Sequence, residues 1–137
     1  MFLGMFDWLQ SLMKKPDPPE EVLGQRGENV AAKHLRNQGY KILVRNFRCH
    51  AGEIDIVARD GRTIVFVEVK TRVNDDPAPE EQVNNHKQHQ ITKVAKHYLS
   101  RYGTPQPPAR FDVVAVVWPT GREPRIRHSP DAFEATS

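Results

Sequence analysis

Two oppositely charged side chains interrupt an apolar segment near the middle of the 137-residue chain. The segment Thr63 to Lys70 reads TIVFVEVK, and its β-branched and aromatic composition is typical of a buried strand. Because residues two apart in a strand project from the same face, Glu68 and Lys70 form one carboxylate–ammonium unit. Unpaired charges are costly to bury, so these two residues indicate a functional site.

A second carboxylate, Asp55, lies in the preceding apolar segment between Ile54 and Ile56, two side chains that we expect to point away from it. If the two segments are adjacent antiparallel strands, Asp55 lies beside Glu68. Grouped carboxylates repel one another unless a cation neutralises them, and Mg²⁺ prefers such hard oxygen ligands. Lys70 beside the cation could hold an attacking water or stabilise a pentavalent phosphorane. The pattern therefore favours metal-dependent phosphate chemistry.

The expected elements follow the order helix, three strands, helix, strand, which predicts an α/β fold with a mixed sheet flanked by helices. The expected elements are a helix over 20–38, antiparallel strands over 40–47, 53–58 and 63–70, a helix with an apolar stripe from Val83 to Tyr102, and a strand over 111–118. A helix precedes the last strand, so we expect it to run parallel to the third. Residues 125–128 could add a short edge strand, and the tail 129–137 carries no clear signal.

Length and composition predict one domain, residues 20–137, preceded by an appendage. Residues 1–19 combine an amphipathic segment with a proline-rich linker, and we expect a short helix that packs on the domain, frays, or docks on a membrane surface or partner. Its apolar run is too short to span a bilayer, so stable membrane insertion is not expected. One cysteine and a net charge of +3 favour the cytoplasm and permit a polyanionic partner.

The strings GEIDIVA at 52–58 and VFVEVKTR at 65–72 resemble the YraN family of uncharacterised bacterial proteins. That family is similar to the PD-(D/E)XK nucleases, in particular the archaeal Holliday-junction resolvases. The resemblance covers residues 24–133 and implies a restriction endonuclease-like αβββαβ core, in which Asp55, Glu68 and Lys70 match the D…ExK signature. Ile54 stands where the superfamily name has proline, at a position that varies within the superfamily.

The same resemblance implies a wider catalytic site. Glu28, on the first helix, matches an additional glutamate near the metal, so the implied catalytic residues are Glu28, Asp55, Glu68 and Lys70. The three carboxylates and the backbone carbonyl of Val69 would hold Mg²⁺, with Mn²⁺ as an alternative. The residues that we expect to contact nucleic acid are Lys87, Gln88, Arg72 and Arg45. Lys87 falls on an apolar stripe, so its stem could instead simply cover the sheet.

The sequence thus predicts a metal-dependent endonuclease that hydrolyses DNA phosphodiester bonds, with branched or structured DNA as the substrate class nearest to the resemblance. A homodimer is implied because junction resolvases cut two strands symmetrically. The main alternative is a module that binds nucleic acid or a partner on the same fold without turnover. An enzyme acting on RNA is a third hypothesis, weakened because no aromatic platform for single strands stands out.

Three further features carry weaker hypotheses. Glu53 should face the same way as Asp55, as an accessory acid or an exposed strand residue. His86 and His89 could share a helix face and bind a transition metal, although no third ligand is evident. Cys49 beside His50 could form a thiol nucleophile, but the sequence offers no acid to orient the imidazole.

Overall fold

The computed structural model describes residues 15–137, so the expected N-terminal helix lies outside the described residues. Residues 15–19 have no regular secondary structure and lead into helix α2 (Glu20–Asn37). The helix ends before Gly39, whose φ of +91° is a left-handed conformation that glycine adopts at little cost. The predicted helix is therefore confirmed to within one residue at its C-terminus. No helix in this part of the chain is long and apolar enough to cross a membrane.

Five strands form one mixed sheet in the order β1-β2-β3-β4-β5, so β3 is central as predicted. They are β1 (Lys41–Cys49), β2 (Gly52–Asp60), β3 (Thr63–Arg72), β4 (Ala109–Val117) and β5 (Arg125–Phe133). Strands β1 to β3 form the predicted antiparallel meander, and β4 runs parallel to β3. At the β2–β3 turn Gly61 takes a φ of +60°, which fits the hairpin signal of Asp60-Gly61. The αβββαβ core is therefore confirmed.

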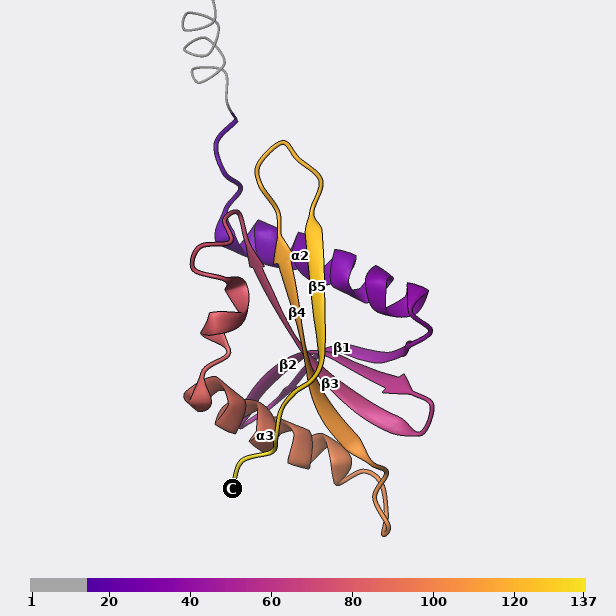
Figure 1. The fold of residues 1–137 in the computed structure, drawn as a ribbon. Helices are drawn as coiled ribbons and strands as arrows, with labels where there is room; N and C mark the ends of the chain where they lie inside the picture. The colour runs from indigo at the N-terminus through magenta and orange to yellow at the C-terminus, as the bar shows by residue number, and fades with distance from the viewer. Residues whose placement is uncertain (1–14) are drawn as a thin grey trace, which may run out of the picture.

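Helices α2 and α3 (Asn85–Leu99) cover opposite faces of this sheet, as Figure 1 shows. On the α2 face, Ala31, Ala32 and Leu35 pack against a cluster that includes Val65 and Val67 of β3. On the α3 face, Ile91, Val94 and Tyr98 pack against Ile54, Phe66 and Phe111. The central strand is thus buried on both sides, which explains its almost continuous apolar sequence.

Strand β5 is longer than predicted, because it continues from Arg125 to Phe133 and not only to His128. Its C-terminal half pairs with β4 through Ser129 and Phe133, and the Phe133 ring stacks on Phe111 with centroids 4.9 Å apart. Asp131 takes a φ of +50° beside a register irregularity. The polar residues 129–131 hide the strand from sequence analysis. The strand continues past them because Phe133 pairs with Phe111 of β4.

The second helix also begins later than its apolar stripe suggests. Pro79–Gln82 form a short 3-10 helix, η1, and α3 starts only at Asn85. The Asn84 side chain accepts a hydrogen bond from the Lys87 amide at 3.0 Å and so caps the helix. Val83 is buried in the α3-side core although it precedes the helix.

Candidate active site

Strands β2 and β3 separate at the position of the predicted acidic pair. Their ladder runs from Asp60↔Thr63 to Ile56↔Val67 and stops there. Beyond this point β2 pairs with β1, and β3 pairs with β4 as far as Arg72. The Val69 amide, which has no backbone partner on β2, donates to Asp55 Oδ2 at 2.8 Å. Asp55 therefore satisfies a backbone donor that the divergence of the two strands would otherwise leave unpaired.

The same divergence breaks the alternation of side chains along β2. Ile54 packs in the α3-side cluster, whereas Ile56 packs in the α2-side cluster. The expectation that both point to one face is wrong, because β2 changes its orientation where it leaves β3. The expectation that Asp55 lies beside Glu68 is confirmed, since each carboxyl is close enough to shift the pKa of the other.

Glu68 is only 4% exposed and has the most strongly perturbed carboxyl of this group. Burial raises its pKa to about 8, and the adjacent Asp55 adds to the rise, whereas Lys87 and Lys70 lower it. Burial also raises the pKa of Asp55, against the hydrogen bonds from Val69 and Glu68. Near neutral pH the raised pKa of Glu68 therefore favours its protonated form beside Asp55.

Two lysines converge on the same oxygen of Glu68. Lys70 Nζ and Lys87 Nζ each lie 3.8 Å from Glu68 Oε1, one from β3 and the other from α3. Both lysine side chains are about 30% exposed or less. The structure thus brings together Asp55, Glu68, Lys70 and Lys87, a set in which two ammonium groups approach two carboxyls where β2 and β3 diverge.

Glu28 comes from the opposite face, on α2, and is 7% exposed. Arg45 donates to its Oε1 from Nε at 3.2 Å and from Nη2 at 3.1 Å, and Asn46 Nδ2 donates to the same oxygen at 3.0 Å. Burial raises the pKa of Glu28, Arg45 opposes this, and the charge of Asp55 raises it further. Glu28 is therefore near enough to Asp55 to interact with it, and its Oε2 accepts no hydrogen bond from the described residues.

The four residues expected to bind nucleic acid have different surroundings. Lys87 faces Glu68, whereas Arg45 is committed to Glu28. Gln88 donates to the Val83 carbonyl at 2.9 Å and so stabilises the start of α3. Arg72 forms an ion pair at 3.0 Å with Glu20, whose side chain is 82% exposed.

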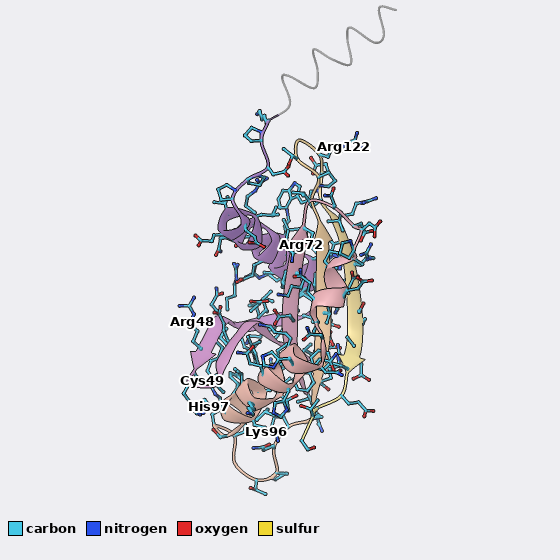
Figure 2. The ribbon with its side chains drawn as sticks, turned by 90° about the vertical axis from the view of Figure 1, so that its left-hand side faces the viewer. Arg48, Cys49, Arg72, Lys96, His97 and Arg122 are labelled. Atoms are coloured by element: carbon cyan, nitrogen blue, oxygen red, sulfur yellow. The ribbon has the colours of Figure 1, made fainter. Side chains whose placement is uncertain are left out.

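Arginine and lysine side chains are spread over both ends of the molecule. Figure 2 shows Arg72 beside α2, and Arg48 and Lys96 at the other end, near the β1–β2 turn. Arg48 is not free of partners, because it pairs with Glu53 at 3.1 Å on the exposed surface. Glu53 is thus a partly exposed strand residue in an ion pair, although its charge still raises the pKa of Asp55.

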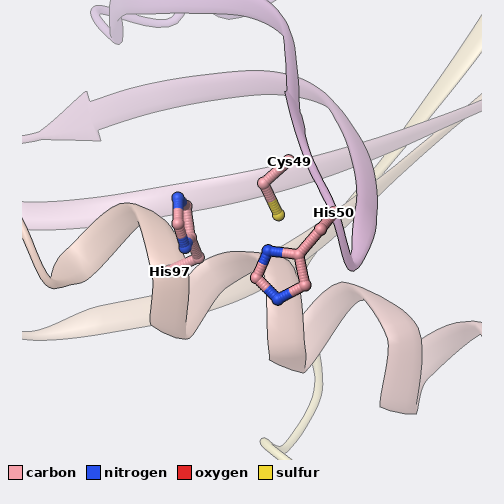
Figure 3. A group of neighbouring side chains, drawn as sticks. All are labelled: Cys49, His50 and His97. Carbon is pink, nitrogen blue, oxygen red and sulfur yellow. The ribbon is translucent and has the colours of Figure 1, made fainter.

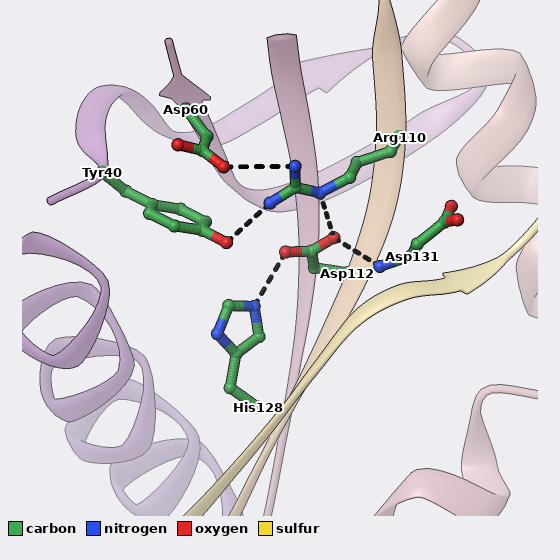
Figure 4. Close-up of polar contacts among 6 residues, drawn as sticks. All are labelled: Tyr40, Asp60, Arg110, Asp112, His128 and Asp131. Atoms are coloured by element: carbon green, nitrogen blue, oxygen red, sulfur yellow. Dashed lines mark hydrogen bonds and ion pairs between the residues drawn. The ribbon is translucent and has the colours of Figure 1, made fainter. Parts of the chain in front are cut away.

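Sequence reasoning missed two features of the polar interior. Asn46 takes a φ of +54° and holds Glu28, a role that its sequence neighbourhood does not reveal. Asp112, which is fully buried, accepts hydrogen bonds from Arg110 Nε at 3.0 Å and the Asp131 amide at 2.9 Å. Its Oδ2 also lies 2.7 Å from His128 Nε2 (Figure 4).

This second network is structural in character. Arg110 continues it to Asp60 at 3.2 Å and to the Tyr40 hydroxyl at 2.6 Å, so it joins β2, β4 and β5 to the residue that precedes β1 (Figure 4). Burial raises the pKa of Asp112, but the hydrogen bonds from His128, Arg110 and Asp131 outweigh it and leave the pKa below its ordinary value. In the sequence, this network is signalled by the charged residue Asp112 within the otherwise apolar strand β4.

The histidine and cysteine hypotheses have different outcomes. His89 Nδ1 lies 2.8 Å from Thr136 Oγ1, and the described residues supply no third ligand to His86 and His89. Cys49 and His50 do lie together, but their third neighbour is His97 of α3 and not an acid. No local sequence pattern associates His97 with Cys49 and His50.

Comparison with known proteins identifies the family. Residues 27–116 match the model of uncharacterised protein family UPF0102. A UPF0102 protein of Geobacter metallireducens is 50% identical over 113 residues, which cover 82% of this chain and 92% of that protein. A UPF0102 protein of Chlorobium limicola is 44% identical over 123 residues, which cover 85% and 95% of the two chains. The chain therefore belongs to uncharacterised protein family UPF0102, the YraN family that its sequence strings indicate.

Proposed function

We propose that the protein is a metal-dependent endonuclease that hydrolyses phosphodiester bonds of DNA. One observation carries this proposal: the buried carboxyl of Glu68 and the partly buried carboxyl of Asp55 lie next to each other where β2 and β3 diverge, and two lysines lie 3.8 Å from Glu68. Neighbouring carboxyls whose pKa values are raised by burial are typical of catalytic or metal-binding sites.

The donor set fits a hard divalent cation. Asp55 and Glu68 offer carboxylate oxygens from two strands, and a cation in place of the Glu68 proton would relieve the repulsion between them. Mg²⁺ or Mn²⁺ takes such oxygen ligands and keeps several waters. The Val69 carbonyl and the uncommitted Oε2 of Glu28 are the further ligands that we propose, the latter directly or through water.

Each side chain of the site then has a distinct task. A bound Mg²⁺ would polarise the scissile phosphate and make water a stronger nucleophile. Lys70, next to Glu68, would hold the attacking water in line with the phosphorus atom, so that its oxygen bonds to phosphorus as the P–O bond to the leaving oxygen breaks. Lys87 would face the negative charge that develops on the phosphate.

Substrate binding would rest on the remaining basic side chains. Arg72 needs only to exchange an exposed partner, Glu20, for a phosphate, and surface ion pairs of this kind contribute little to stability. Arg45 and Gln88 would act indirectly, by holding Glu28 and the start of α3. Phosphate contacts contribute affinity and little sequence reading, so we propose recognition of DNA shape, in particular branched DNA. A cytoplasmic location and a homodimer complete the proposal.

Cleavage of a labelled substrate panel tests the proposed activity. The panel contains linear duplex, single strand, flap, four-way junction and structured RNA, each incubated with Mg²⁺ or Mn²⁺. We expect cutting of branched DNA, and a loss of about 100-fold or more in Asp55→Asn. The matched control on the same strand is Glu53→Gln, which should cut as the wild type does. Binding without cutting would favour the non-catalytic module. Cutting of RNA alone would show that the substrate is RNA and not DNA.

A further inference from the structure

The β1–β2 turn and the C-terminal half of α3 bring three metal-ligating side chains together outside the acidic site. Cys49 is the last residue of β1, His50 follows it in the turn, and His97 lies on α3. One ligand atom from each lies within 4.8 Å of the other two. Figure 3 shows the Cys49 sulfur next to the His50 ring, with the His97 ring to one side of both.

Packing fixes this approach of the turn to the helix. The Phe47 ring meets Tyr98 edge to face, with centroids 5.2 Å apart, and it also contacts the His97 ring at 6.2 Å. Gly52 takes a φ of +140°, and a Cβ at this position would lie 2.8 Å from Gln90 Nε2 of α3. The lack of a side chain at Gly52 therefore lets the turn lie close against α3, which holds Cys49 and His50 opposite His97.

We propose that Cys49, His50 and His97 bind a borderline or soft transition-metal cation, with Zn²⁺ as the representative ion. One thiolate and two imidazoles are ligands that Zn²⁺ favours, at about 2.3 Å for sulfur and about 2.0 Å for nitrogen. The sulfur–nitrogen and nitrogen–nitrogen pairs of a tetrahedral site with those bond lengths lie roughly 3.3–3.5 Å apart. The three ligand atoms, now within 4.8 Å of one another, therefore need to approach by at most about 1.5 Å. His50 and His97 are exposed and Cys49 is partly exposed, which allows the side-chain rotations that this requires.

This site differs in chemistry from the acidic site and does not depend on the proposed function. A sulfur–nitrogen set rejects Mg²⁺, which prefers oxygen ligands, whereas the Asp55–Glu68 pair suits it. Three protein ligands leave a fourth tetrahedral position for water or another ligand. Because the ligands come from two elements, the cation would clamp the β1–β2 turn to α3 and stabilise the folded chain, by an amount that grows with the logarithm of its concentration above the Kd.

Cobalt absorption tests the proposal, with Co²⁺ as a coloured substitute for Zn²⁺. The chain is used full length, untagged, reduced and freed of metals, and Co²⁺ is added while the near-ultraviolet band of thiolate-to-cobalt charge transfer is recorded. We expect one equivalent to produce the band, Zn²⁺ to remove it, and excess Mg²⁺ to leave it unchanged. Zn²⁺ should also raise the melting temperature of the wild type.

Matched variants distinguish metal binding at this site from nonspecific binding and from binding at the acidic site. Cys49→Ser should abolish the band, and His50→Ala or His97→Ala should weaken Co²⁺ binding by about tenfold or more. His86→Ala, an exposed histidine of the same helix, and Asp55→Asn should leave the band intact. Circular dichroism confirms that each variant folds. No band with the wild type, or a band that survives His97→Ala at full affinity, would overturn the proposal.

Discussion

Glu68→Gln should stabilise the metal-free protein at neutral pH. Because burial and Asp55 raise the pKa of Glu68 from 4.5 to about 8, the folded chain holds a proton there that the unfolded chain releases. The stability contribution of this group is complete below pH 4.5 and is lost as the pH rises towards 8, by about 1.4 kcal/mol per pH unit. At pH 7 the loss is about 3 kcal/mol. Glutamine has no proton to lose and can still donate a hydrogen bond to Asp55.

Urea unfolding with a chelator present, followed by circular dichroism, measures this effect. The variant should exceed the wild type by about 3 kcal/mol at pH 7 and by much less at pH 5, where the wild type also keeps its proton. Glu53→Gln is the control, because this partly exposed side chain forms only a surface ion pair and should change stability by about 0.5 kcal/mol or less. Equal stabilities of wild type and Glu68→Gln at pH 7, or a destabilised variant, would refute the assigned protonation state.

Three further predictions follow from the same contacts. Mn²⁺ affinity, measured by isothermal titration, should rise about tenfold per pH unit up to about pH 8 and then level off, because the cation displaces the proton of Glu68; a constant affinity would contradict this. Asp112→Asn should cost about 3–5 kcal/mol in urea unfolding, whereas the exposed control Asp131→Asn should cost little. In wild type, the contribution of Asp112 should disappear as the pH falls through its depressed pKa, and an unchanged unfolding midpoint in Asp112→Asn would contradict its role. Gly27→Ala should cost about 1–3 kcal/mol in urea unfolding, because its Cβ would clash with the Thr71 side chain; failure of Thr71→Ala to restore part of this stability would count against the clash.

The fold was predictable because its signals are local. The continuous apolar run of β3, the Asp60-Gly61 turn and the period of α3 each lie within a short stretch of sequence. The pairing of β3 with β4 follows from the helix between them. Strand β5 was underestimated because Phe133 joins the sheet through Phe111, a contact between residues far apart in the chain.

The site was predictable only in its centre. Asp55 and Glu68 meet because a tight hairpin connects their strands. Their distances from the turn along the sequence therefore predict that they lie close together in the fold. The hydrogen bonds of Glu28 to Arg45 and Asn46 link α2 to β1, and no local pattern encodes them. The approach of His97 to the β1–β2 turn likewise depends on how α3 packs on the sheet.

Single-turnover cleavage by Glu68→Gln tests the central claim most directly. The substrate is the panel member that the wild type cuts, with Mg²⁺ at pH 8, and the unfolding assay confirms that the variant is folded. If Glu68 holds the catalytic cation, the variant should be at least as stable as the wild type and yet cleave about 100-fold more slowly or not at all. Cleavage by the folded variant at the wild-type rate would show that the Asp55–Glu68 pair is not the catalytic site.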